Sequence, residues 1–199
     1  MNTPSKLLLA VIAAAALSFA RPVSANLITN GGFETGDFTG WTDTGHLSNI
    51  GVSGNVSGTA PHSGNFQAFF SPNVGHNFLS QNIATSAAAS YTITFFLALV
   101  GDPANDFFSV NWNGASIFSL LFVGPFDYTE FTFNVTATSP LSELQFEFRN
   151  DAAFRGSYWL LDDVSVTPTG VGVPDAGSTL PLLGFASLGL VALRRKLGC

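Results

Sequence analysis

The sequence is short of cysteine and of basic residues. Its one cysteine, Cys199, is the last of 199 residues, so an intrachain disulfide is excluded and the fold must be held by packing or by a metal. Between residues 26 and 173 only Arg149 and Arg155 are basic, against twelve acidic residues, which gives this span a net charge of −10. A domain with this charge repels phosphate backbones, so nucleic-acid binding is disfavoured.

Signatures of catalysis are missing as well. The sequence has no G-x-S-x-G, no H-E-x-x-H, no P-loop and no Cys/His cluster of the zinc type. Its three histidines, His46, His62 and His76, lie among turn residues on different segments, a pattern typical of solvated loops rather than of a zinc site.

The acidic residues do not form an opposed pair either. Glycoside hydrolysis needs two carboxylates that face each other about 5 to 9.5 Å apart. Glu143 and Glu147 share one strand face with Gln145, and neighbouring Asp162 and Asp163 are expected on opposite faces of their strand. We therefore predict a protein without catalytic residues.

The first 25 residues have the pattern of a secretory signal peptide. A Leu/Ala-rich run at 7–19 follows Lys6, and the segment RPVSA at 21–25 ends it with a small-residue cleavage pattern. The alternative, an N-terminal anchor helix, needs roughly 20 apolar residues, and this run is interrupted too early. We predict cleavage of residues 1–25 and a mature chain that begins at Asn26.

The middle of the chain, residues 26–168, predicts an all-β domain. Apolar and polar residues alternate, Thr and Phe are enriched, and Gly, Asn, Asp, Ser and Pro punctuate the pattern. The predicted strands are 46–53, 65–71, 78–85, 90–100, 106–112, 115–123, 126–137, 141–149 and 157–167. This number of short strands fits a two-sheet β-sandwich, or jelly roll, in one domain.

One hairpin is specified by its turn. Asn113-Gly114 is the pair that a two-residue type I′ turn requires, because both central positions need positive φ. The turn predicts that Trp112 pairs with Ala115 and Val110 with Ile117. Trp112 then shares an apolar face with aliphatic residues, which favours a place in the core.

Asp162 stands out in the strand SYWLLDDVSV. Period-2 alternation puts Leu160, Asp162, Val164 and Val166 on one face, so a carboxylate is expected among apolar side chains. A buried carboxylate must be paired, protonated or bound to a cation. With so few bases available, calcium is a suitable partner, since it takes six to eight oxygen ligands. Alternatively, Asp162 reaches solvent at the strand end or caps a loop.

The opening of the mature chain, NLITNGGFETGDFTGWT, resembles the first strand of the galactose-binding-like jelly rolls found in many carbohydrate-binding modules. The segments PHSGNFQAFF, NFLSQNIAT, YTITFFLAL and LLDDVSV follow in the order of that superfamily, over residues 26–168. The resemblance implies a structural calcium between Glu34 and Asp162, completed by backbone carbonyls.

Sugar binding in this superfamily depends on exposed aromatic side chains, and the resemblance therefore implies aromatic ligand candidates here. These candidates are Trp41, Tyr128, Tyr158 and Trp159. Trp159 is expected on the strand face opposite Asp162. With 20 Phe in the chain, most aromatic residues are expected to be core residues, and packing is an alternative role for Trp41.

The C-terminal segment VPDAGST, within a linker at 169–178, resembles the VPDSG variant of the PEP-CTERM sorting signals, with Ala176 in place of Ser. The matching residues are Val173, Pro174, Asp175, Gly177, Ser178 and Thr179. The resemblance implies processing by an exosortase, a membrane-embedded enzyme that cuts near the motif. The motif is a substrate and has no catalytic role.

An apolar run at 179–193 follows the motif and predicts a short transmembrane helix. Fifteen residues give roughly 22 Å of helix against a hydrocarbon core of about 30 Å. Arg194, Arg195 and Lys196 then hold the 194–199 tail in the cytoplasm by the positive-inside rule. This predicts a transient tether to the inner membrane; a permanent tail anchor is the alternative.

These features together predict an exported, non-catalytic protein of the cell surface or extracellular matrix, sorted by an exosortase and associated with exopolysaccharide. One alternative is a carbohydrate-binding module with a specific glycan ligand, and another is a small secreted hydrolase. Exposed aromatic residues on one sheet face would favour the binding module, and two facing carboxylates in a pocket would favour the hydrolase.

Overall fold

The computed structural model describes residues 25–46, 49–71, 75–101, 106–121, 123–149 and 156–169, all within the compact unit Ala25–Thr169. Residues 1–24 of the predicted signal peptide lie outside the described residues. So do the sorting motif, the predicted helix at 179–193 and the basic tail. In the part of the chain that is described, no helix is long and apolar enough to cross a membrane.

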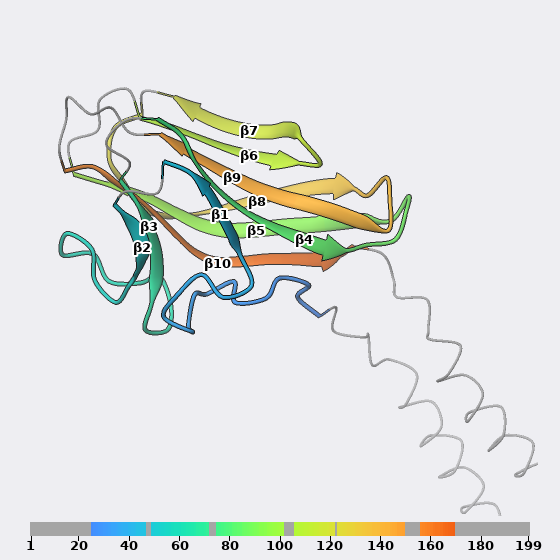
Figure 1. Cartoon of the computed structure of the whole chain (residues 1–199), viewed down its shortest axis with the longest axis horizontal. Helices are drawn as coiled ribbons and strands as arrows, with labels where there is room; N and C mark the ends of the chain where they lie inside the picture. The colour runs from blue at the N-terminus through green and yellow to red at the C-terminus, as the bar shows by residue number, and fades with distance from the viewer. Residues whose placement is uncertain are drawn as a thin grey trace, which may run out of the picture. The chain divides into compact units, whose positions relative to one another are not determined.

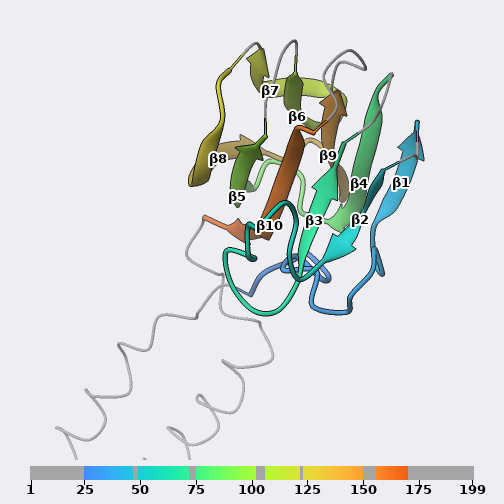
Figure 2. The ribbon, with the colours of Figure 1, turned by 90° about the vertical axis from the view of Figure 1, so that its left-hand side faces the viewer.

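The described residues form two five-stranded antiparallel sheets that pack face to face (Figures 1 and 2). Sheet A has the order β1 (Thr42–Gly45), β4 (Asn77–Ala84), β9 (Leu141–Arg149), β6 (Phe107–Trp112) and β7 (Ala115–Leu121). Sheet B has the order β2 (Ile50–Ser53), β3 (Gln67–Phe70), β10 (Tyr158–Pro168), β5 (Ser90–Val100) and β8 (Phe126–Thr136). The predicted all-β, two-sheet sandwich is confirmed.

Most strands lie where hydrophobic alternation predicts them. Strands β5 and β9 have the predicted bounds, and β9 alternates between buried and half-buried residues from Ser142 to Arg149. The prediction is wrong at 46–53, where only Ile50–Ser53 is a strand and a separate strand, β1, precedes it. Both β1 and β2 have four residues, too few for alternation to identify them.

The β6–β7 hairpin forms with a register that differs in part from the prediction. Asn113 and Gly114 both have positive φ, and Trp112 pairs with Ala115 as expected. A shift in register between Val110 and Asn111 then pairs Val110 with Phe118, not with Ile117. A β-bulge adds one residue to one strand, which is why the turn alone does not determine the pairs beyond it.

Aromatic side chains fill the space between the sheets. Phe70 of sheet B stacks on Phe148 of sheet A with ring centroids 3.7 Å apart and planes 5° apart. Trp159 of sheet B lies 5.5 Å from Phe108 of sheet A, and Phe95 meets Phe146 edge-to-face at 5.2 Å. Trp112 is buried, as predicted. Offset and edge-to-face contacts of this kind add to the stabilisation that burial provides.

The segment before β1 closes one end of the sandwich without forming a strand. Its Phe33 is fully buried and stacks on Trp41 at 5.8 Å. Gly31 accepts the amide of Val164 at 2.9 Å, and a Cβ at position 31 would lie only 2.0 Å from the Val164 carbonyl oxygen. The Gly-Gly-Phe sequence therefore lets the backbone approach β10 closely enough for Phe33 to enter the core.

This close approach predicts that Gly31→Ala destabilises the fold by about 2 kcal/mol or more, because the added methyl group meets backbone that cannot rotate away. Gly124→Ala is the matched control, since a Cβ at Gly124 meets nothing within 4 Å. We expect the control to stay within about 0.5 kcal/mol of the parent protein. Urea unfolding of the three proteins measures the difference, and equal midpoints would contradict the steric argument.

Candidate functional site

A β-bulge in β10 sets the direction of the two neighbouring aspartates. Asp162 pairs with Phe96 of β5, but the next pair along the strand is Ser165 with Thr94, and Asp163 has a positive φ of 49°. The extra residue changes which side chains point inward. It is the physical reason why the period-2 prediction fails in this strand.

The four residues predicted to share a face are therefore divided between two faces. Val164 and Val166 point into the main core between the sheets. Leu160 packs with Val56 and Ala98 in a separate cluster, outside sheet B and beneath the loop that follows β2. Asp162 is also covered on this outer side, by the 62–66 segment.

Asp162 is buried, with 0% of its surface exposed, and backbone amides satisfy both of its oxygens. The Ser63 amide donates to Oδ2 at 3.2 Å, and the Asp163 amide donates to Oδ1 at 2.8 Å. Burial raises the pKa of Asp162 to about 6, because desolvation disfavours the charged form more than these hydrogen bonds favour it. Asp162 is thus a carboxylate whose charge is incompletely compensated.

Glu34 is held by the same segment. Its Oε1 accepts the amides of Asn65 at 2.8 Å and Phe66 at 3.0 Å, and its Oε2 accepts the Asn65 side-chain amide at 3.2 Å. The Phe66 and Asn65 amides lower the pKa of Glu34. Gly64 lies so close that a Cβ there would be 2.3 Å from Glu34 Oε1. Glu34 and Asp162, which lie far apart in the sequence, are therefore both held by the 62–66 segment.

Asp163 lies on the same side, which corrects the prediction that Asp162 and Asp163 point to opposite faces. His62 Nδ1 is 2.6 Å from one Asp163 oxygen, and the Ser63 hydroxyl donates to the other at 2.7 Å. The His62 ring also stacks on Phe96, with centroids 3.5 Å apart. His62 was expected to be a solvated loop residue. No local pattern marks its contact with β10, because the partners are about 100 positions apart.

This cluster offers a hard, all-oxygen donor set of the kind that calcium prefers. Glu34, Asp162 and Asp163 all flank Gly32, and the charge of Asp163 adds to the burial that raises the pKa of Asp162. Among the described residues, however, no group of three His, Cys, Asp or Glu side chains is close enough to hold an ion. A cation here would have to bind Glu34 and Asp162 together with backbone carbonyl groups. The oxygen ligands therefore fit calcium, but side chains alone do not complete its coordination shell.

The four aromatic ligand candidates have different environments. Trp159 is 0% exposed and Trp41 is 8% exposed, so both are core residues, and the expectation that their rings bind a ligand is corrected. Tyr128 is half-buried outside sheet B, where its hydroxyl donates to Gln67 and burial raises its pKa. Tyr158 is also half-buried outside sheet B.

Sheet A presents a continuous polar surface on its outer side. Strand pairing places Phe78, Glu147 and Ser109 in one row across β4, β9 and β6, and Ser80, Gln145 and Asn111 in the next row. Phe107 of β6 pairs with Arg149 of β9, one row further along. We call these outward side chains the polar face; it consists of Phe78, Ser80, Phe107, Ser109, Asn111, Gln145, Glu147 and Arg149, whose guanidinium lies 5.8 Å from the centre of the Phe107 ring.

Hydrogen bonds connect the side chains of the polar face. Glu147 binds His76 Nδ1 through one oxygen and accepts the Ser109 hydroxyl at 3.1 Å through the other. The Asn111 amide donates to Gln145 at 3.3 Å. The His76 ring lies between two aromatic rings, 6.3 Å from Phe78 and 6.2 Å from Phe107. The face therefore combines fixed polar groups with aromatic rings at its edge.

Solved structures with a similar fold include several carbohydrate-binding modules. TmCBM61 in complex with β-1,4-galactotriose has a TM-score of 0.61 at 18% identity, over 73% of this chain and 99% of that one. The Family 16 Carbohydrate Binding Module-2 has a TM-score of 0.54 at 15% identity, over 71% and 99%. The K1 cleaved adhesin domain of Lys-gingipain from Porphyromonas gingivalis W83 has 0.51 at 15%, over 70% and 96%. At these identities the likeness is one of fold.

The C-terminal end adds a second comparison. Residues 172–197 match the VPDSG-CTERM motif, which contains the predicted sorting residues. No curated protein matches the sequence. The chain thus carries a VPDSG-CTERM motif that follows, in the sequence, a β-sandwich similar in structure to carbohydrate-binding modules. The motif implies an exported, surface-associated protein that is processed by a sorting enzyme.

Proposed function

We propose that this protein is a non-catalytic component of the cell surface or extracellular matrix that binds a neutral polysaccharide through its polar face. The polar face is the observation that carries the proposal. It offers aromatic rings at Phe78 and Phe107 and, in the same and the next row of the sheet, the carboxylate, amide and hydroxyl groups that hydrogen-bond sugar hydroxyls. The fold is similar to that of TmCBM61, a protein whose structure contains β-1,4-galactotriose.

The geometry of the polar face supports binding rather than hydrolysis. Glu143 and Glu147 lie along one strand, β9, and do not oppose each other across a cleft. Glu147 is held by His76 and Ser109 in a flat row of strand side chains. Fixed side chains on a rigid sheet lose little entropy when a ligand binds, which favours recognition of an extended chain.

The charge of the domain selects against acidic polymers. The span from 26 to 173 carries twelve acidic and two basic residues, so an anionic polysaccharide would be repelled. A neutral glycan avoids this cost. We therefore expect binding of uncharged β-linked polysaccharides, with β-1,4-galactan as one test ligand.

Truncation of an aromatic ring at the polar face should weaken polysaccharide binding. For Phe78→Ala and Phe107→Ala of the exported protein, we expect roughly 5- to 30-fold weaker affinity, the range in which contact residues at binding sites commonly fall. Affinity gel electrophoresis against β-1,4-galactan, xylan and a mixed-linkage glucan measures this loss of retardation. Thr132→Ala, at an exposed site of β8 outside sheet B, is the control and should bind as the parent does. Unchanged binding by both Phe variants would rule out the polar face.

We also propose that the sorting enzyme is an exosortase and that the protein reaches its final location by cleavage near the VPDAGST segment. Intact-mass analysis of the protein from its native host, with and without the exosortase, tests this. We expect a form that begins at Asn26 and ends between Pro174 and Thr179 only when the enzyme is present. A form that still ends at Cys199 in both strains would make the tail a permanent anchor.

We further propose that calcium binds at Glu34 and Asp162 as a structural ion. The incompletely compensated charge of Asp162 would attract the ion. The ion would then hold residues 32–34, the 62–66 segment and β10 together. The ion would supply no chemistry beyond this stabilisation. The two carboxylates keep lone pairs that their amide donors do not use.

Calcium should raise the melting temperature at pH 7 by about 5 to 10 °C at a concentration near 100 times its Kd. At pH 5 the effect should be smaller, because a carboxyl with a folded-state pKa of about 6 is then largely protonated and a proton competes with the ion. Without calcium the sign is reversed: the raised pKa makes Asp162 a source of instability that grows as the pH rises from its unfolded-state pKa to about 6 and stays constant above that.

Thermal melts of the exported protein in calcium, in magnesium and in chelator measure these effects. Asp162→Asn should abolish the calcium response, while Asp127→Asn, at an exposed position of β8, should preserve it. A calcium response that is unchanged in Asp162→Asn would place the ion elsewhere. No response in the parent protein at millimolar calcium would exclude a structural calcium.

A further inference from the structure

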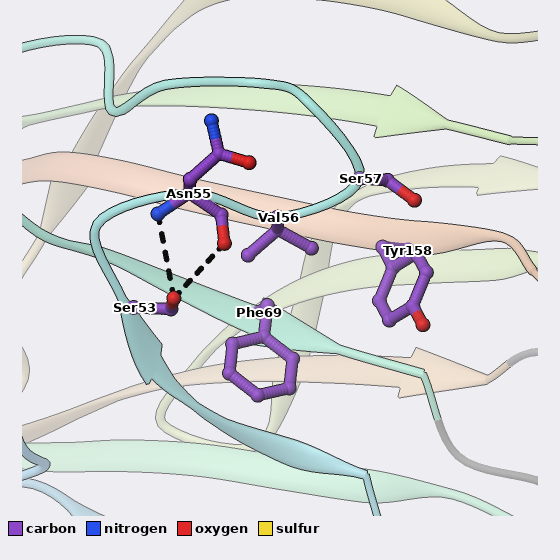
Figure 3. Close-up of a pocket in the computed structure, with 6 residues that line it drawn as sticks. All are labelled: Ser53, Asn55, Val56, Ser57, Phe69 and Tyr158. Atoms are coloured by element: carbon purple, nitrogen blue, oxygen red, sulfur yellow. Dashed lines mark hydrogen bonds between the residues drawn. The ribbon is translucent and has the colours of Figure 1, made fainter.

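We propose that a pocket outside sheet B binds a single neutral sugar residue, as a second site on the side of the sandwich opposite the polar face. The pocket has a volume of about 250 Å³ and is lined by Ser53, Asn55, Val56, Ser57, Phe69 and Tyr158 (Figure 3). Its walls come from the end of β2, the loop that follows it, β3 and β10. The inference extends the proposed polysaccharide binding and is tested separately from it below.

Two aromatic rings and a valine form the apolar part of the pocket. Phe69 and Tyr158 lie on adjacent strands with ring centroids 6.4 Å apart and planes 66° apart, so the rings present faces in different directions. Val56 lies next to both rings (Figure 3) and is 7% exposed, packed on Leu160 and Ala98. The C–H surfaces of a sugar ring pack on ring faces of this kind, and binding pockets commonly combine such walls with a few polar groups.

The loop that closes the pocket is held in place by its own hydrogen bonds. The Ser53 hydroxyl donates to the Asn55 carbonyl at 3.0 Å and accepts the Asn55 amide at 3.3 Å (Figure 3). Asn55 Oδ1 accepts the Gly58 amide at 3.0 Å, and Val56 and Thr59 bond each other's backbone. The wall is therefore formed before a ligand arrives, which lowers the entropic cost of binding.

Two hydroxyls at the pocket remain for a ligand. Within the described part of the chain, neither the Tyr158 hydroxyl nor the Ser57 hydroxyl has a hydrogen-bond partner, whereas the Ser53 hydroxyl and Asn55 Oδ1 are bonded within the loop. Ser57 points toward the Tyr158 ring (Figure 3). Hydroxyl groups both donate and accept, as sugar hydroxyls do, so the two side chains suit a ligand that carries both functions.

Size and charge restrict the ligand further. A volume of about 250 Å³ is below the 300 to 1,000 Å³ that is typical of sites for drug-sized ligands, so one sugar ring fits better than an oligosaccharide. None of the six lining residues is charged, which gives no counter-charge for an acidic or basic sugar. A neutral ring at a chain end or on a side branch fits these conditions.

A second site on this side would change what one molecule does in a matrix. The polar face is outside sheet A and the pocket is outside sheet B, and the two sheets are the opposite layers of the sandwich (Figure 2). One domain would then contact two polysaccharide chains at once. Simultaneous contact of this kind raises the avidity of a surface-bound protein far above the affinity of either site.

Saturation-transfer NMR with the exported protein tests the pocket, since the method detects weak binding of free sugars. The probes are galactose, glucose, xylose, arabinose and N-acetylglucosamine, each added alone. We expect a signal from at least one of them. Tyr158→Phe, which keeps the ring and removes only the hydroxyl, should weaken the affinity for that sugar roughly 2- to 10-fold. Ser57→Leu, which fills the pocket from its exposed rim, should abolish the signal.

The polar-face variant Phe78→Ala separates the two sites. We expect it to lose polysaccharide retardation but keep the free-sugar signal, and we expect Ser57→Leu to do the reverse. A free-sugar signal that survives in Ser57→Leu and disappears in Phe78→Ala would overturn the pocket while leaving the proposed function intact. A parent protein that binds polysaccharide but gives no free-sugar signal would also overturn the pocket and leave the proposed function intact. A parent protein that binds neither would refute both the pocket and the polysaccharide binding. Thermal melts confirm that each variant is folded.

Discussion

The contact between aromatic rings of the two sheets is the interaction on which the rest of the structure depends. No disulfide is available within the chain, and the stacked pair Phe70 and Phe148, with Trp159 against Phe108, joins sheet B to sheet A directly. Because these rings occupy the interior, they are not available to a ligand, which is why Trp159 and Trp41 fail as binding candidates. The proposed glycan binding therefore depends on the outer faces of the sheets, toward which every other residue of a strand points.

Hydrophobic alternation was sufficient to predict the fold class and the longer strands, including β5 and β9 at their observed bounds. It failed in β10, because the period-2 rule assumes an uninterrupted strand and the residue at Asp163 adopts a left-handed conformation that adds one position. It also could not reveal that His62 and Ser63 meet Asp163, since nothing local records a contact across some hundred residues. The resemblance to carbohydrate-binding modules brought Glu34 and Asp162 together, and the structure shows the amides that hold them.

The 62–66 segment explains how three carboxylates are tolerated near Gly32. The raised pKa of Asp162 reflects mainly its burial and, to a smaller extent, the like charge of Asp163. Backbone amides of Ser63, Asn65 and Phe66 offset part of this cost by donating to Asp162 and Glu34, and His62 pairs with Asp163. Local geometry thus depends on a loop that crosses the outside of sheet B. The same stretch of chain, a few residues earlier, forms one wall of the pocket proposed to bind a sugar.

Strand β10 has a position that matters for mechanical load. It lies in the interior of sheet B, hydrogen-bonded to β3 on one side and to β5 on the other, and it ends at Pro168, next to the segment that leads to the sorting motif. In a molecule that is held by its C-terminal end while its outer faces bind a polymer, the pulling force would act along β10. The two ladders would then be loaded in shear, many hydrogen bonds at a time, rather than opened one by one as at a sheet edge. If the sorted protein stays attached through its C-terminal end, the load enters through an interior strand, which resists extraction better than an edge strand would.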